Sequence, residues 1–268
     1  MSTARPPEGA QHRSAQAEGT PVGATPWPYP RWIAHRGGGT IAPENTLAAL
    51  RTGARYGFRM AECDVKLSAD GVAFLLHDDT LERTTNGRGV AGQQPWTQLS
   101  RLDAGAWHSP AHAGEPPPTL EAVARWCLAH GHMLNIEIKP SPGEDRRTGE
   151  AVAAEAARLW QGVPVPPLLT SFRTQALEGA RTRAAGLPRG LLLDKPWAGW
   201  EEAARALGCV ALVAHQTLWD APRVAFARSE GWRCLAYTVN DPQQAQRLLA
   251  LGLDGLITDR IDGFDPNS

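Results

Sequence analysis

Five side chains suited to acid–base and electrostatic chemistry are concentrated in one stretch of the chain, residues 32–78. Two histidines, two carboxylates and an arginine lie at or near the ends of short apolar runs: His35, Arg36, Glu62, Asp64 and His77. In an α/β protein such runs are β-strands, and side chains at the strand ends face a common cleft. We therefore expect these residues to share one site.

The acidic residues form a pattern typical of a metal centre. Glu62 and Asp64 are two apart on one predicted strand, so their side chains project to the same side. Glu137 lies in a later run, MLNIEIK, on the same side as Lys139. Unpaired buried carboxylates are costly, and an all-oxygen set suits a hard divalent cation. The alternative is that these carboxylates form ion pairs with Arg36 and Lys139.

The two histidines predict general acid–base catalysis. His35 ends the first run and His77 ends the third, so they could flank one reacting group as base and acid. Arg36 and Lys139 would supply the positive charge that a phosphate ester requires. Spacing does not decide which histidine is the base. The other six histidines are interpreted as structural or exposed, although His215 also lies at a strand end.

The elements that must position these residues are short strands alternating with helices. Nine apolar runs are predicted as strands, at 32–35, 60–66, 72–77, 133–138, 168–171, 189–194, 210–215, 233–239 and 255–258. Most are separated by segments with helical spacing. This alternation predicts an α/β protein with parallel strands covered by helices. A simple eight-stranded barrel needs one strand fewer.

A hairpin accounts for the extra strand. The segment 68–71 is far too short for a helical crossover and ends in Asp-Gly, a hairpin turn signal. The fold class is therefore predicted as a TIM (β/α)8 barrel with a β-hairpin after strand 2. With the turn centred on Ala69 and Asp70, His77 would lie opposite Glu62, and Leu75 opposite Asp64.

Two further segments are expected to stand apart from the barrel. Residues 79–118 are polar and rich in Gly and Pro, and they predict a small inserted subdomain over the barrel mouth. Residues 1–29 are predicted to be a disordered leader, because their start is rich in Pro, Gly, Ala, Gln and Ser. The catalytic barrel is then expected to span 30–268.

The composition of the chain limits the classes of binding partner that we expect. The net charge of −1 gives no electrostatic argument for nucleic acid, which favours a small-molecule substrate. No window approaches the ~20 apolar residues of a membrane span. Four cysteines lie far apart in apolar runs, so buried reduced thiols and a cytoplasmic location are expected. A monomer or homodimer is expected.

Several motifs together closely resemble the glycerophosphodiester phosphodiesterase family, of the bacterial cytosolic type. They are HRGGGTIAPENT at 35–46, ECD at 62–64, DG at 70–71, HD at 77–78, EIK at 137–139, YTVN at 237–240 and GLDGLITD at 252–259. The resemblance covers nearly all of residues 32–262. It implies a TIM barrel with a small insertion after the second catalytic histidine.

The resemblance also implies roles for single residues. His35 and His77 would be the acid–base pair and Arg36 would contact phosphate, to which the residue chemistry adds Lys139. The metal, Mg2+ or Ca2+, would be bound by Glu62, Asp64 and Glu137. Tyr237 stands where many members have Trp, and with Asn240 it is a candidate for the substrate pocket.

The implied reaction is metal-dependent hydrolysis of glycerophosphodiesters, such as glycerophosphocholine or glycerophosphoethanolamine, to an alcohol and sn-glycerol 3-phosphate. Two alternatives stay open. One is lysophospholipase D or phospholipase D-like cleavage of an acylated phosphodiester, which would need an apolar groove. The other is a barrel that binds phosphodiesters without turnover. The sequence does not distinguish direct attack by water from a cyclic phosphate intermediate.

Overall fold

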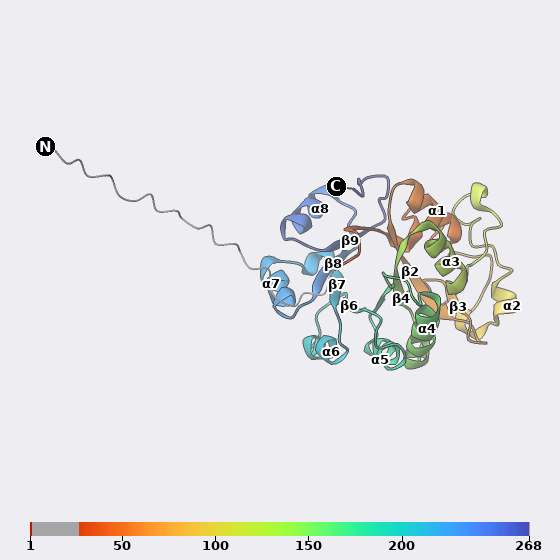
Figure 1. Ribbon diagram of the computed structural model, residues 1–268. Coiled ribbons are helices and arrows are strands. Elements are labelled where there is room, and N and C mark those ends of the chain that lie inside the picture. Colours follow the sequence, from red (N-terminus) through yellow and green to blue (C-terminus); the bar gives the residue numbers. More distant parts are fainter. Residues whose placement is uncertain (2–26, 268) are drawn as a thin grey trace.

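Eight parallel strands form a closed barrel in the computed structural model, which describes residue 1 and residues 27–267 (Figure 1). Each strand pairs with the next, and β1 pairs with both β2 and β9, which closes the barrel. The strands are β1 (Trp32–Ala34), β2 (Met60–Leu67), β4 (Met133–Ile138), β5 (Leu168–Ser171), β6 (Arg189–Leu193), β7 (Ala211–His215), β8 (Arg233–Tyr237) and β9 (Gly255–Thr258). The predicted TIM barrel is confirmed.

Helices surround the strands (Figure 1). They are α1 (Leu47–Arg55), α3 (Leu120–His130), α4 (Asp145–Leu159), α5 (Thr174–Arg183), α6 (Trp200–Ala206), α7 (Ala221–Ser229) and α8 (Pro242–Ala250). Successive side chains along each strand point alternately toward the helices and toward the inside of the barrel. In β2, Cys63 and Val65 pack in the apolar layer that also contains residues of α3 and α4. Glu62 and Asp64 therefore project into the barrel, as predicted.

The ninth run forms the hairpin partner, but its predicted register was wrong. β3 (Ala73–Leu75) pairs antiparallel with β2, with Leu75 opposite Val65 rather than Asp64. The cause is the turn: Ser68 pairs with Val72, and the loop between them has three residues and ends in Gly71 at φ 85°. Three-residue hairpin loops commonly end in a left-handed glycine. The extra loop residue shifts β3 by one position.

Residues 79–118 pack beside the hairpin. They contain η2 (Ala91–Gln93), α2 (Trp96–Leu99) and η3 (Pro110–His112), and in Figure 1 α2 lies beyond β3, away from the centre of the barrel. Their small apolar cluster joins Leu81, Ala91 and Leu99 to Phe74 of β3. The segment also reaches back to the barrel, where Glu115 accepts a hydrogen bond from the backbone of Ala48 in α1.

The described chain begins to pack on the barrel before the predicted boundary at residue 30. Tyr29 is buried, its ring lies edge-on to Trp27, and its hydroxyl donates a hydrogen bond to the carbonyl of Pro166. Aromatic burial explains why these residues belong to the fold. The rest of the predicted leader, residues 2–26, lies outside the described residues.

This packing makes a truncation series informative. Removal of residues 1–29 should lower the melting temperature relative to removal of residues 1–26, because it deletes two packed aromatic rings. Loss of one such ring costs about 3 kcal/mol, or about 6–12 °C for a domain of this size. Calorimetry of the two truncated proteins measures the difference. Equal melting temperatures would show that the contacts of Trp27 and Tyr29 contribute no stability.

The structure shows the expected state of the cysteines. All four cysteines are buried and free of disulfides. None of the described helices has both the length and the apolar character needed to cross a bilayer.

Candidate active site

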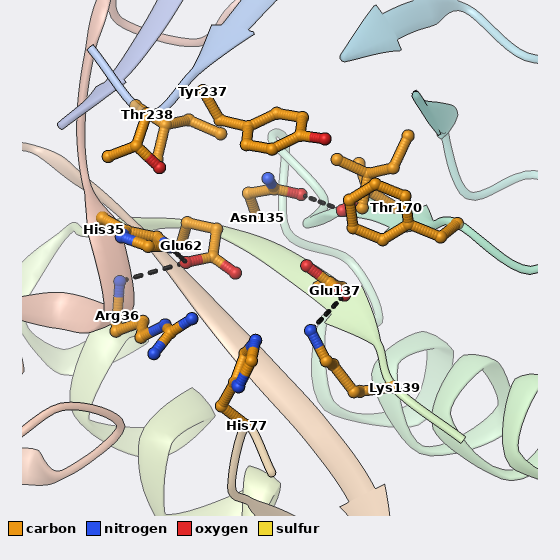
Figure 2. A pocket seen from close by; sticks show the side chains of 13 residues that line it. His35, Arg36, Glu62, His77, Asn135, Glu137, Lys139, Thr170, Tyr237 and Thr238 are labelled. Atoms are coloured by element: carbon orange, nitrogen blue, oxygen red, sulfur yellow. Dashed lines mark hydrogen bonds and ion pairs between the residues drawn. The ribbon is translucent and has the colours of Figure 1, made fainter. Parts of the chain in front are cut away.

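Seven of the predicted site residues line one cavity of about 170 Å³ at the carboxyl ends of the strands. They are His35, Arg36, Glu62, His77, Glu137, Lys139 and Tyr237. Figure 2 shows Arg36, His77 and Lys139 on one side of this cavity, Tyr237 and Thr238 on the other, and the two glutamates between them. The structure therefore brings the predicted groups together.

The length of β2 explains how His77 reaches the cavity. β2 pairs with β1 only at Ala61, but continues for six more residues to Leu67. The hairpin turns at that far end, and β3 runs back toward the barrel. His77 follows β3 and therefore points back at the carboxylates of β2, despite the one-residue error in the predicted register.

Glu62, Asp64 and Glu137 form an acidic centre whose ligand oxygens all lie within 4.8 Å of one another. β2 and β4 pair with Asp64 opposite Glu137, which accounts for this proximity. Burial, reinforced by the charge of Asp64, raises the pKa of Glu62 to about 8 and that of Glu137 to about 7. Two buried carboxyl groups thus lack sufficient compensating positive charge.

Asp64 is the ionised member of the acidic centre. Burial alone would raise its pKa, but Lys139 and Arg36 outweigh burial and lower it to about 2. Its Oδ2 accepts a hydrogen bond of 2.8 Å from the amide of Asn45, a residue with a left-handed backbone (φ 58°). A carboxylate fixed in this way, beside two others, matches the all-oxygen donor set of a hard divalent cation.

The ion pairs of the alternative interpretation are also present. Lys139 Nζ lies 3.0 Å from Glu137 Oε1 and 3.4 Å from Asp64 Oδ1. Arg36 Nε lies 3.4 Å from Asp64 Oδ2. The pKa values of Glu62 and Glu137 stay raised despite these ion pairs. Arg36 and Lys139 therefore offset only part of the negative charge of the acidic centre.

His35 is oriented by a carboxylate that spacing did not single out. Its Nδ1 lies 2.5 Å from Asp259 Oδ1, and its Nε2 lies 3.8 Å from Glu62. Burial lowers the pKa of the His35 imidazole, but Asp259 and Glu62 outweigh burial and raise that pKa above its ordinary value. Asp259 directly follows β9, a strand-end position that signals a site residue in a barrel.

Asn240 supports this arrangement and is not among the residues that line the cavity, so its place in the substrate pocket stays a prediction. Its Nδ2 donates a hydrogen bond of 2.9 Å to Asp259 Oδ2, and its Oδ1 accepts from the backbone of Asp259. The loop after β8 lies beside the end of β9, which places the amide on Asp259. Tyr237 does line the cavity, with its hydroxyl hydrogen-bonded to the carbonyl of Leu193.

His77 has a different environment. Its Nδ1 lies 2.7 Å from Asp78 Oδ1, but Arg83 of the insertion also binds both oxygens of Asp78, at 2.6 and 2.9 Å. Burial, together with the charges of Arg36 and Lys139, lowers the pKa of His77 below its ordinary value. The two histidines therefore favour opposite protonation states.

The chain is similar to known glycerophosphodiester phosphodiesterases. The sequence profile of the Glycerophosphoryl diester phosphodiesterase family matches residues 35–263. A glycerophosphodiester phosphodiesterase of Caldanaerobacter subterraneus is 31% identical over 237 residues, covering 85% of this chain and 93% of the relative.

Solved structures show the same fold. A phosphodiesterase of Oleispira antarctica, in complex with the product sn-glycerol-3-phosphate, has a TM-score of 0.80 and 35% identity, over 86% of this chain and 93% of the other. A glycerophosphodiester phosphodiesterase of Agrobacterium tumefaciens has a TM-score of 0.72 and 26% identity, over 87% of this chain and 97% of the other. The chain therefore belongs to the glycerophosphoryl diester phosphodiesterase family.

Proposed function

We propose that this enzyme hydrolyses glycerophosphodiesters such as glycerophosphocholine and glycerophosphoethanolamine to an alcohol and sn-glycerol 3-phosphate. The observation that carries the proposal is the single cavity that joins two histidines of opposite pKa shift to a buried acidic centre and two cationic side chains. The presence of sn-glycerol 3-phosphate in the Oleispira relative supports the same product here.

Glu62, Asp64 and Glu137 would hold the metal, Mg2+ or Ca2+. When bound, the metal would polarise the phosphoryl group and lower the pKa of the nucleophile, either water or the substrate's own glycerol hydroxyl. Arg36 and Lys139 would bind the non-bridging phosphate oxygens, because both extend charged groups into the same side of the cavity.

The opposite shifts of the two histidines suggest their roles. His77, with its lowered pKa, would be neutral and accept the proton of the nucleophile. His35, with its raised pKa, would be protonated and donate to the leaving oxygen. Asp259 would orient the His35 ring and stabilise its charged form through Nδ1, leaving Nε2 toward the cavity.

The direct test is release of glycerol 3-phosphate from glycerophosphocholine by chelator-treated protein, with and without added Mg2+ or Ca2+. Metal-dependent release is expected. If a lysophospholipid is cleaved instead, the phospholipase D-like alternative is correct. If no diester is cleaved under any condition, the proposed reaction is contradicted and the non-catalytic binding barrel becomes the interpretation to pursue.

Asp259→Asn tests the proposed role of the His35 partner. The substitution keeps the size of the side chain but removes the charge that stabilises the His35 imidazolium, so kcat should fall at least tenfold. The alkaline limb of the pH–rate profile, which reports loss of the proton from His35, should also shift to lower pH as the pKa of His35 falls. The acidic limb, which reports protonation of His77, should stay in place because Asp259 does not act on His77. A profile identical to the wild type would contradict the role of Asp259.

We further propose a reducing, cytoplasmic location, supported by the four buried thiols. Fractionation of cells that express the full chain would test it. Recovery in an oxidising compartment would contradict it.

A further inference from the structure

Six described side chains carry a buried polar atom without a hydrogen-bond partner: Trp27, Arg36, His108, Asn135, Ser141 and Thr148. Only two of these six line the active-site cavity, Arg36 and Asn135. Arg36 already has carboxylate neighbours. The amide Nδ2 of Asn135 has no partner, although the residue is only 1% exposed.

The orientation of this amide is set by its other end. Asn135 Oδ1 accepts a hydrogen bond of 2.9 Å from the hydroxyl of Thr170 on the neighbouring strand β5. With the oxygen committed to Thr170, the nitrogen is left as a donor on the cavity side. A buried donor is normally paired in a native protein, so a partner that enters the cavity is expected.

The position of Asn135 within the cavity indicates what that partner is. Asn135 pairs in register with Glu62 and lies two residues before Glu137 on the inward face of β4. In Figure 2 it lies between these glutamates and Tyr237, away from Arg36, His77 and Lys139. The remaining lining residues are uncharged: Thr170, Phe172, Leu192, Tyr237, Thr238 and Ile257.

An uncharged lining that mixes apolar side chains with the amide of Asn135 does not suit a phosphate, but it suits a hydroxyl group. We propose that Asn135 Nδ2 donates a hydrogen bond to a hydroxyl of the glycerol unit, and that this contact selects glycerol-bearing phosphodiesters over those with a simple alkyl group. The inference rests on the proposed function, since it assigns a subsite within the same cavity. Thr170 is the positioning residue for the amide.

The experiment compares two ligands that differ only in their hydroxyls. Calorimetry in magnesium-containing buffer would measure Kd for sn-glycerol 3-phosphate and for propyl phosphate. Wild-type protein should bind the glycerol compound more tightly. Asn135→Leu, which keeps the shape but removes the donor, should lose roughly tenfold affinity for sn-glycerol 3-phosphate and none for propyl phosphate. Thr170→Val should show a smaller loss with the same ligand preference.

Ser141→Ala is the matched control, since the Ser141 hydroxyl is also buried without a partner but does not line the cavity. It should leave both affinities unchanged. Equal losses for both ligands in Asn135→Leu, no loss for either, or no preference in the wild type would overturn the inference. Hydrolysis of glycerophosphocholine by the same preparations separates the two proposals: preferential binding without hydrolysis contradicts the reaction but not the contact.

Discussion

The substitutions His35→Ala and His77→Ala should each reduce the rate of glycerophosphodiester hydrolysis by about three orders of magnitude. A positioned general acid or base contributes roughly 10²–10⁴-fold, and each ring lies in the cavity with its Nδ1 held by a carboxylate. Both side chains are partly exposed, at 18% and 31%, so neither substitution removes much core packing. Release of glycerol 3-phosphate, with a thermal melt of each variant, measures the effect.

His215→Ala provides the control for these two substitutions. This histidine also ends a barrel strand, and its ring packs edge-on to Tyr237 with centroids 5.9 Å apart. It does not line the cavity, so its removal should change the rate by less than about threefold. A variant of His35 or His77 with near wild-type activity would remove that residue from the mechanism.

The strands and their inward faces could be predicted because both depend on local pattern. Alternation of apolar and polar residues places Glu62, Asp64 and Glu137 on inward faces whatever the details of packing. The hairpin register is more sensitive, since one extra loop residue before Val72 shifts every pair. His77 still arrives at the acidic centre because the long strand β2 returns the hairpin toward the mouth.

The partners of the catalytic residues could not be predicted in the same way. Asp259 lies 224 residues after His35, and their contact exists only because β9 closes the barrel against β1. Arg83 likewise reaches Asp78 and Glu44 only through the fold of the insertion. The first contact depends on closure of the barrel and the second on the fold of the insertion, and local spacing encodes neither. Asn240 lies at the expected end of the barrel, but its hydrogen bonds to Asp259 could not be read from the sequence.

In the presence of a chelator of divalent metals, the free energy of unfolding of the protein should fall as the pH rises from about 5 to 8. Glu62 and Glu137 have folded pKa values of about 8 and about 7, above the ordinary value of 4.5. Between the ordinary and the raised pKa values the folded state binds more protons than the unfolded state, so the free energy of unfolding falls with increasing pH. The expected loss is of the order of a few kcal/mol. Thermal melts of chelated protein across this range measure it.

Addition of Mg2+ or Ca2+ should reverse this trend, because the cation binds the ionised carboxylates of the folded state. The melting temperature should rise most at pH 8, where deprotonation of the metal-free protein costs most. Glu137→Gln separates the two effects: it removes one of the crowded negative charges, so the chelated variant should lose less stability than the wild type at pH 8 but respond less to metal. If the wild type instead shows no pH trend and no response to either ion, Arg36 and Lys139 already compensate the carboxylates, and the ion-pair interpretation of the acidic centre is correct.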